Sequence, residues 1–370
     1  MPAKQLMPTV HENLSCEILL TNSCNMSCDY CIAKNIPGPT MSRETGRKAI
    51  DMFVYLAEGG KYIEFTFTGG EPLIDFLLLK DLADYAEERA CEAGMQVHFV
   101  LKTNGTILNR DIINFMRTHC IRVVVSIDGI LPVHDKHRRT LGGEGTHDVV
   151  SRNLLALLQN QISCVASVTV HPDSSKMVLE SVRYLHGLGV DQIDIGPAYG
   201  TVIWTDTYNL NLVQSLVDVA NYMREVNNKG CRIDVGPLYR ESEHVGDILS
   251  ERWGCHAAST NLAFLPNGQV TGCSALAMLV SRFPELVLGD VFDGLDQPAI
   301  DHLLQLAQAG YEDRPTCQEC QAATNCTGGC LAINYSTSGF PLAPPDVYCQ
   351  TISSIPEAWR RAWTGHDVHR

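Results

Sequence analysis

Two patterns of hydrophobic and polar positions alternate along the first two hundred residues, one typical of strands and one typical of helices. Six short runs rich in β-branched and aromatic residues predict strands. These runs are residues 16–21, 62–70, 96–105, 121–129, 164–170 and 192–198. Stretches in which apolar residues recur every three to four positions lie between them and predict amphipathic helices. These stretches are residues 42–60, 77–94, 110–120, 147–161 and 176–190.

Capping residues support this alternation, because Ser42 precedes one helical stretch and Gly94 and Gly187 lie near the ends of two others. Strands that alternate with helices predict a parallel sheet. The regular size of the six units favours a full or partial barrel over a doubly wound sheet, so we expect an α/β fold with a partial (β/α)6 TIM-like barrel. In such barrels the reactive groups lie at the carboxyl ends of the strands.

Composition limits the class of protein. The chain has 370 residues, 45% hydrophobic and 19% charged, which is enough for one large domain or a large and a small one. The formal net charge is −14 and the basic residues are scattered, unlike those of a nucleic-acid-binding protein. No secretory segment is recognisable, and no run reaches the roughly 18 apolar residues of a membrane span. We therefore expect a cytoplasmic protein that binds neither nucleic acid nor membrane.

Fifteen cysteines are too many for an ordinary protein of this kind, and metal ligation explains them better than a disulfide framework. One group, Cys24, Cys28 and Cys31, follows the first predicted strand. Seven more lie in the last third of the chain: Cys255, Cys273, Cys317, Cys320, Cys326, Cys330 and Cys349. The isolated ones are expected to be buried apolar thiols: Cys16, Cys91, Cys120, Cys164 and Cys231.

The first group has the spacing C-x3-C-x2-C. A tetrahedral zinc site requires four ligands, whereas a 4Fe–4S cluster held by three cysteines keeps one iron open for a substrate. Four further motifs follow the next strands in order. They are "TGGEP" (68–72), "KTNG" (102–105), "SIDG" (126–129) and "HDKHRRTLGGEGTHD" (134–148).

Together these five motifs resemble those of the radical S-adenosylmethionine (radical SAM) enzymes. The resemblance implies that Cys24, Cys28 and Cys31 hold a 4Fe–4S cluster whose open iron binds SAM. It implies further SAM contacts, with Glu71 at the methionine amino group, Ser126 near the ribose and Arg138 at the carboxylate. The full set of implied SAM-binding residues is Gly69, Gly70, Glu71, Pro72, Asn104, Ser126, Asp128 and Arg138. Such enzymes cleave SAM reductively to a 5′-deoxyadenosyl radical that abstracts hydrogen from an unactivated C–H bond.

The last third contains "CQECQAATNCTGGC", and a hairpin turn is predicted at Pro266-Asn267-Gly268. The spacing C-x2-C-x5-C-x3-C resembles the SPASM domain of radical SAM maturases. The resemblance implies two auxiliary 4Fe–4S clusters, three clusters in all. One would be held by Cys317, Cys320, Cys326 and Cys349, and the other by Cys255, Cys273 and Cys330.

The second set lacks a fourth cysteine. Either His256 or Cys231 completes it, or its fourth iron is open. A structural zinc ribbon is the alternative for the whole region, but seven thiolates do not fit one tetrahedral site. By this resemblance the barrel covers residues 12–235 and the SPASM region residues 236–360.

Relatives of this kind mostly modify ribosomally made peptides. The resemblance therefore implies a precursor peptide as substrate, two-electron oxidation with an intramolecular C–C, C–O or thioether crosslink as product, and flavodoxin or ferredoxin as reductant. The alternatives are a formylglycine-forming sulfatase maturase and a small-molecule dehydrogenase. Sulfatase maturases typically carry an aspartate base where this chain has Ser274, which argues against the first alternative.

The segment before the first strand is too short for a winged-helix recognition domain, so recognition falls to the barrel, the SPASM region or a separate protein. An iron–sulfur electron carrier without its own turnover is the third alternative, but a carrier needs no SAM clamp such as Glu71 and Arg138. Candidates for contact with the substrate are Tyr199, Trp204 and Asp206, which follow the sixth strand. The sequence assigns no general acid or base.

Three polar residues near these motifs are given structural roles. His134 and Asp135 are expected to shape a turn, and His171 before Pro172 is expected to be a hydrogen-bonded loop histidine.

Overall fold

The computed structural model describes residues 13–33, 36, 38, 40–200, 202–236, 238, 255–310, 312–320, 326 and 328–353. The domain limits expected at residues 12 and 360 therefore lie outside the described residues. The expected division at residues 235 and 236 falls shortly before 239–254, which are also outside them.

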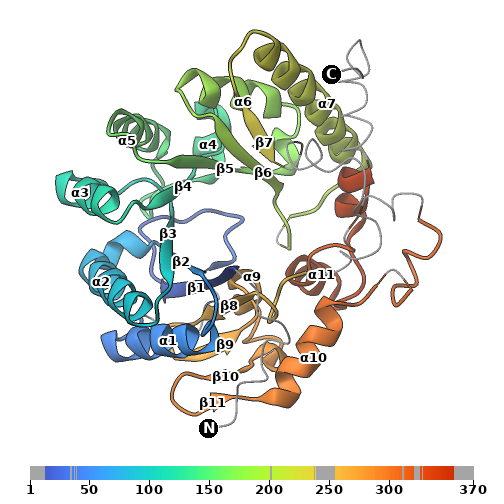
Figure 1. The fold of residues 1–370 in the computed structure, drawn as a ribbon. Coiled ribbons are helices and arrows are strands. Elements are labelled where there is room, and N and C mark those ends of the chain that lie inside the picture. Colours follow the sequence, from blue (N-terminus) through green and yellow to red (C-terminus); the bar gives the residue numbers. More distant parts are fainter. Residues whose placement is uncertain are drawn as a thin grey trace.

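A parallel sheet forms the centre of the fold. Its strands are β1 (Asn13–Thr21), β2 (Tyr62–Gly69), β3 (Gln96–Thr103), β4 (Arg122–Ser126), β5 (Cys164–Val170), β6 (Gln192–Pro197) and β7 (Asp234–Gly236), in that spatial order. Figure 1 shows that the sheet curves into an open barrel with helices on its outer side. The predicted α/β class and partial barrel are confirmed.

The helices between these strands agree with the predicted stretches. They are α1 (Arg43–Leu56), α2 (Phe76–Glu92), α3 (Arg110–Thr118), α5 (His147–Gln159) and α6 (Val178–Gly187). The Ser42 side chain caps α1 by accepting a hydrogen bond from the Thr45 N–H, as predicted. Gly94 follows α2 with φ +72°, a conformation that glycine adopts without strain.

Three elements of the barrel were not predicted. The helix α4 (Leu131–His137) and the strand β7 are too short to show a period. The helix α7 (Asp206–Asn228) is long, and its buried Leu212, Leu216 and Met223 do have helical spacing, so the signal for it was present. Short η2 (Pro72–Asp75) and η3 (Pro172–Ser174) turns follow β2 and β5.

The C-terminal region extends the same sheet. Strand β8 (Asn261–Phe264) pairs in parallel with β1, and β9 (Gln269–Thr271) returns antiparallel to it through the predicted turn, where Gly268 has φ +94°. Phe53 of α1 packs edge-on against Phe65 of β2 and Phe264 of β8, with ring centroids 5.5 and 6.4 Å apart. One hydrophobic core therefore supports both the barrel and the strand that leads to Cys273.

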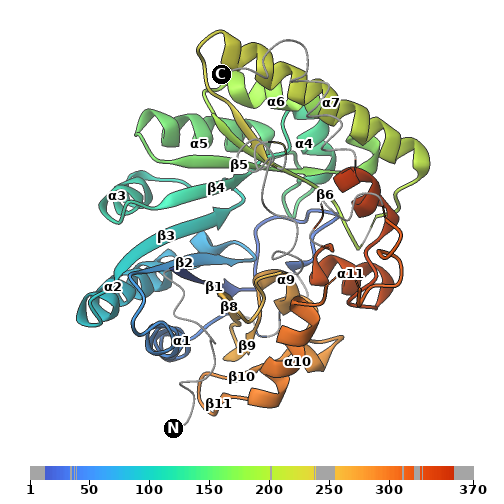
Figure 2. The same cartoon turned by 45° about the vertical axis from the view of Figure 1, so that its right-hand side comes forward.

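The remaining C-terminal elements lie at this edge of the barrel. They are α9 (Ser274–Ala277), η4 (Pro284–Leu286), β10 (Gly289–Asp290), β11 (Gly294–Leu295), α10 (Gln297–Ala307) and α11 (Leu331–Ser338). Figure 2 shows α9 and α11 beside the region toward which the barrel opens, with α10 next to them. These C-terminal elements thus lie alongside the barrel rather than apart from it.

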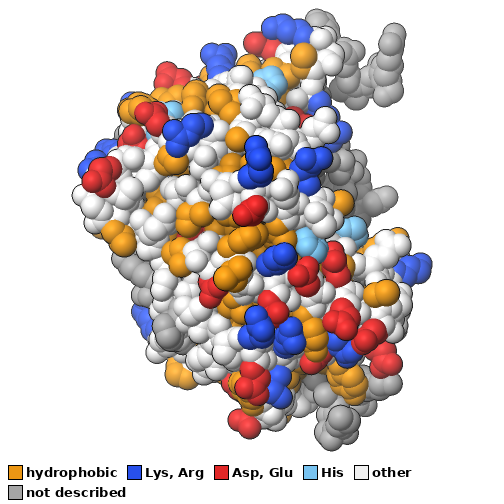
Figure 3. All heavy atoms as spheres, turned by 90° about the vertical axis from the view of Figure 1, so that its left-hand side faces the viewer, with side chains coloured by type: hydrophobic (Ala, Val, Ile, Leu, Met, Phe, Trp, Pro, Cys, Tyr) orange, Lys and Arg blue, Asp and Glu red, His pale blue; other side chains and the backbone are white. Residues whose placement is uncertain are grey.

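The outer surface is mixed in character. On the face in Figure 3, basic side chains lie among acidic ones, with small hydrophobic areas between them. No helix of the described residues has both the length and the apolar character that crossing a membrane requires.

Candidate functional site

A loop with three cysteines follows β1 and is fastened to the segment after α4. The Ser27 N–H donates to the Arg139 carbonyl at 2.8 Å, and Met26 forms an antiparallel bridge with Thr140. The Asp29 carboxylate lies 2.8 Å from His137 Nδ1. The loop from Cys24 to Cys31 and the segment with Arg138 therefore form one unit.

Two glycines allow the end of β2 to approach this loop. The Gly70 N–H donates to the Thr21 carbonyl at 2.7 Å, and the Glu71 N–H donates to the Ser23 carbonyl at 2.9 Å. A Cβ atom on Gly69 would lie 2.4 Å from the Thr21 oxygen, and one on Gly70 would lie 2.2 Å from the Ser23 oxygen. Only glycine fits at these two positions, which explains the "GG" of the motif.

Glu71 is fully buried beneath the loop. Its carboxylate accepts hydrogen bonds from the Leu73 N–H at 3.0 Å, the Thr103 hydroxyl at 2.9 Å and the Asn104 N–H at 2.7 Å. Burial raises its pKa to about 7 in spite of these bonds. The Asn104 amide in turn lies 3.6 Å from Cys24 Sγ, so the ends of β1, β2 and β3 meet here.

Arg138 is buried and paired with Asp128. Arg138 Nε donates to Asp128 Oδ2 at 2.9 Å, and Tyr30 Oη donates to the same oxygen at 2.5 Å. The other oxygen, Asp128 Oδ1, accepts from the Thr169 N–H at 2.9 Å. Burial raises the pKa of the Cys28 thiol to about 11, and the charge of nearby Arg138 opposes the rise. Asp128 thus orients Arg138 toward the cysteine loop, and Ser126 ends β4 two residues before it.

The nearby polar residues have the structural roles expected of them. His134 Nδ1 accepts from the Asp128 N–H at 3.2 Å, and burial lowers the pKa of His134 to about 3, so the ring is neutral. Asp135 Oδ1 accepts from the His147 N–H at 2.8 Å at the start of α5. His171 accepts from the Asp173 N–H in the turn after β5.

The spacing of donor atoms distinguishes a zinc site from a cluster site. Among the described residues, donor atoms of His137, His171 and Asp173 lie within 4.8 Å of one another, but no three cysteine sulfurs do. Zn–S bonds of 2.3 Å in tetrahedral geometry would hold the sulfurs about 3.8 Å apart. Among the described residues, no three cysteine sulfurs are therefore spaced for a single zinc ion.

The sequence resemblance implies two C-terminal ligand sets, which we call group A (Cys255, Cys273 and Cys330) and group B (Cys317, Cys320, Cys326 and Cys349). Burial raises the pKa of Cys273, and negative charge on Cys330 and Cys255 would raise it further. Burial likewise raises the pKa of Cys349 to about 11, with further contributions from the other three thiols of group B. Cys273 thus lies near members of group A and Cys349 near members of group B, and the assignment of each group to a cluster stays a prediction.

The two residues that the sequence offers as a fourth ligand of group A differ in position. His256 is exposed, and its carbonyl caps the turn before β8. Cys231 follows α7 and lies beside Tyr222, whose pKa it helps to raise. The expectation that the isolated cysteines are buried is correct for Cys16 and Cys164 and wrong for Cys91, Cys120 and Cys231, which lie at exposed helix ends.

Two charged residues near the cysteine groups were missed by the sequence analysis. Arg314, only 1% exposed, lies beside cysteines of both groups. Glu17 of β1 accepts hydrogen bonds from Ser274, next to Cys273, and from Lys102 of β3. The sequence did contain a signal for Glu17, which is a glutamate inside the apolar run "CEILLT". It contained no signal for Arg314, a lone arginine before Cys317.

The three substrate candidates after β6 differ in position. Tyr199 is largely buried beside Tyr348, Cys330 and Cys349, and this burial raises its pKa. The Trp204 indole N–H donates to the Ala198 carbonyl at 2.8 Å, so it packs on its own loop. Asp206 is exposed at the first turn of α7.

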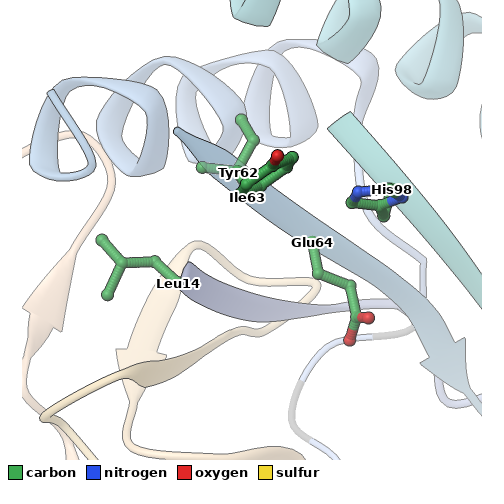
Figure 4. Close-up of a pocket in the computed structure, with 5 residues that line it drawn as sticks. All are labelled: Leu14, Tyr62, Ile63, Glu64 and His98. Carbon is green, nitrogen blue, oxygen red and sulfur yellow. The ribbon is translucent and has the colours of Figure 1, made fainter. Parts of the chain in front are cut away.

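A separate pocket lies at the opposite ends of the strands. Figure 4 shows Leu14, Tyr62, Ile63, Glu64 and His98, which line it at the amino ends of β1, β2 and β3. The Tyr62 and His98 rings stack there at 5.9 Å. Because the cysteine loop and the motifs lie at the carboxyl ends, this pocket is not the candidate active site.

Comparison with known proteins agrees with this geometry. Residues 18–192 match the radical SAM superfamily. The chain is 28% identical over 280 residues to an uncharacterised protein of Methanocaldococcus jannaschii, covering 71% of this chain and 96% of that protein. It is 26% identical over 369 residues to the serine-type anaerobic sulfatase-maturating enzyme of Klebsiella aerogenes, covering 93% of this chain and 88% of that enzyme.

Solved structures share the fold over most of the chain. The structure of anSMEcpe with bound AdoMet and a peptide matches with a TM-score of 0.79 at 18% identity, covering 94% of this chain and 96% of that one. SuiB of Streptococcus suis bound to its precursor peptide SuiA matches with a TM-score of 0.64 at 15% identity, covering 91% and 76%. Residues 18–192 therefore form a radical SAM domain, and the homology to the anaerobic sulfatase-maturating enzymes over most of the chain indicates an enzyme.

Proposed function

We propose that this enzyme oxidises a ribosomally made peptide by two electrons and forms an intramolecular crosslink in it. One observation carries the proposal. Two contacts on the inner side of the sheet link its strands to the cysteine sites. Asn104, at the end of β3, contacts Cys24 of the cysteine loop. Glu17 of β1 accepts a hydrogen bond from Ser274, next to Cys273 of group A. A substrate held along this face would lie near both sites. A radical formed through the SAM-binding site could then pass the second electron of the oxidation to an iron–sulfur cluster in group A.

The cofactor set follows from the donor groups. Cys24, Cys28 and Cys31 would hold the SAM-binding 4Fe–4S cluster, and groups A and B would hold two auxiliary clusters. Glu71 and Arg138 have the charges to hold the amino and carboxylate groups of SAM, with Gly69, Gly70, Pro72, Asn104 and Ser126 around them. When bound, SAM and the reduced cluster supply a radical that removes hydrogen from a C–H bond. The reductant would be a flavodoxin or ferredoxin.

The chain's own residues would bind and orient SAM and the peptide. Asp128 would act through Arg138, because its oxygens are already bonded to Arg138, Tyr30 and Thr169. Glu71 is fully buried and joins the ends of β2 and β3 through its bonds to Thr103 and Asn104. Recognition of the peptide would use the barrel's inner face or a separate protein.

A second candidate is formylglycine formation at a peptide serine or cysteine. The match to the serine-type sulfatase-maturating enzyme over 93% of the chain favours it. Ser274 argues less against it than the sequence indicates, because the Glu17 carboxylate lies 2.7 Å from the Ser274 hydroxyl. A carboxylate therefore lies beside position 274 although the residue there is serine.

Mass spectrometry separates these reactions. The anaerobically purified enzyme would be incubated with SAM, dithionite and two sets of peptides, those encoded beside its gene and serine- or cysteine-containing segments of sulfatases. Loss of two hydrogens with fragmentation suppressed between two residues supports the crosslink. An aldehyde that reacts with a hydrazide supports formylglycine instead. Deoxyadenosine without a change in any peptide overturns both and favours a small-molecule substrate.

A further inference from the structure

Arg314 is a buried cation without a carboxylate partner. It is 1% exposed and is the largest of the fully buried side chains. Its Nη1 donates to the Gly328 carbonyl at 2.7 Å and its Nε to the Ala309 carbonyl at 3.3 Å. No ion pair between Arg314 and an acidic side chain is found in the part of the chain that the structure describes. A buried charge in this state is costly unless a counter-ion is supplied.

Cysteine sulfurs of both C-terminal groups are potential anions near Arg314. Negative charge on Cys317 and Cys326 of group B and on Cys255 of group A would stabilise the Arg314 cation. The charge of Asp313 acts more weakly, and its carboxylate accepts from the Gly310 N–H at 3.0 Å. Hydrogen bonds also connect Arg314 with both groups. The Gly328 N–H donates to Cys326 Sγ at 3.3 Å and the Cys317 N–H donates to the Arg314 carbonyl at 2.8 Å, while the Cys255 N–H donates at 2.8 Å to the carbonyl of Ala307, two residues before Ala309.

The thiols become anions only as ligands. A free cysteine thiol is mostly neutral at neutral pH. Metal ligation deprotonates a thiol outright, and the thiolates of an iron–sulfur cluster give it net negative charge. Clusters in groups A and B would thus provide the counter-ions that Arg314 lacks.

We propose that Arg314 is a positioning residue, the shared counter-ion of the two auxiliary clusters, and that it holds the reduction potentials of both up. The inference rests on the cofactor set proposed above. A nearby cation stabilises the reduced form of a cluster, which is more negative than the oxidised form, and burial strengthens this effect. Its two backbone carbonyl acceptors fix the guanidinium without neutralising it.

The test is a redox titration of the anaerobically purified holoenzyme followed by electron paramagnetic resonance, with iron measured beforehand. In Arg314→Met, we expect the midpoint potentials of both auxiliary clusters to shift downward while that of the SAM-binding cluster stays in place. Arg314→Lys keeps the positive charge, so its auxiliary midpoint potentials should lie close to those of the wild-type enzyme. The matched control is Arg152→Met, an exposed arginine of α5, which should leave all potentials unchanged.

The outcomes separate this inference from the cofactor proposal. If Arg314→Met contains the full amount of iron and its auxiliary midpoint potentials are unchanged, the proposed role of Arg314 is overturned and the cofactor proposal stands. A wild-type enzyme that contains only the SAM-binding cluster overturns the cofactor set and the inference with it. If Arg314→Met loses auxiliary iron, recovery in Arg314→Lys supports a role of charge, whereas equal loss in both variants shows a packing role and overturns the proposal.

Discussion

Ser274 holds the carboxylate of Glu17 by two hydrogen bonds, one from its backbone N–H at 2.6 Å and one from its hydroxyl at 2.7 Å. Lys102 donates to the same carboxylate at 2.6 Å. Burial alone would raise the pKa of Glu17, but the charge of Lys102 and these hydrogen bonds lower it overall. An ionised carboxylate of the first strand therefore fastens the residue next to Cys273 to the barrel.

Replacing Glu17 by Gln should weaken this attachment. The amide accepts fewer hydrogen bonds and carries no charge for Lys102, so we expect the free energy of unfolding to fall by about 1–3 kcal/mol. Because the pKa of Glu17 is lowered in the folded state, its ionised carboxylate stabilises the fold fully at pH values above the usual pKa range of a glutamate. This stabilisation is lost as the pH falls through the lowered pKa. Anaerobic denaturant titrations at neutral pH and at a pH below the usual pKa range of a glutamate measure both effects.

The matched control for this change is Glu88→Gln, an exposed position of α2. It should alter the free energy of unfolding by less than about 0.5 kcal/mol at either pH. Equal stability of the Glu17 variant and this control would show that Ser274 gains nothing from the carboxylate.

Gly70→Ala should disrupt the cysteine loop. Its Cβ would lie 2.2 Å from the Ser23 carbonyl oxygen, which is backbone and has no rotamer to change. The loop must move, so we expect loss of most SAM binding and of the cluster held by Cys24, Cys28 and Cys31, with a stability cost of about 1–3 kcal/mol. Iron content and SAM affinity by equilibrium dialysis are the measurements. Gly187→Ala is the control, because nothing lies within 4 Å of a Cβ there.

SAM affinity should depend on pH through Glu71. Burial raises its pKa to about 7, and only the ionised form attracts an ammonium group. The dissociation constant for SAM should therefore fall as the pH rises from 6 to 8, and binding near pH 7 should release a proton. Calorimetry in buffers of different ionisation enthalpy measures that release. Glu71→Gln should bind SAM more weakly without this pH dependence, and an unchanged dependence would assign it to another group.

The sequence predicted most of what is local in the structure. Period and caps predicted the six strands and the turn at Gly268, and the motifs placed Cys24 and Glu71 at adjacent strand ends. The pairing of β8 with β1 joins residues far apart in the chain, and no local pattern encodes it. The same limit explains why Arg314 was missed: a buried cation is recognised only when its neighbours are known.

The cysteine groups should lose their iron independently. Cys320→Ala belongs to group B and should remove about four iron atoms per chain, while Cys273→Ala in group A should remove a different set of about four. Neither change should stop reductive cleavage of SAM, because the cysteine loop after β1 is separate from both groups. Conversely, changing Cys24, Cys28 and Cys31 together to Ala should abolish deoxyadenosine and leave the auxiliary iron.

Iron analysis, Mössbauer spectra and deoxyadenosine assays measure these losses, with Cys91→Ala as the control because that thiol is exposed on α2. Deoxyadenosine formed by the triple variant would contradict the assignment of the SAM-binding cluster. Zinc in place of iron in groups A and B would contradict the auxiliary clusters. Loss of all C-terminal iron from either single variant would show one shared site, so the two groups must separate in this experiment for the division into A and B to hold.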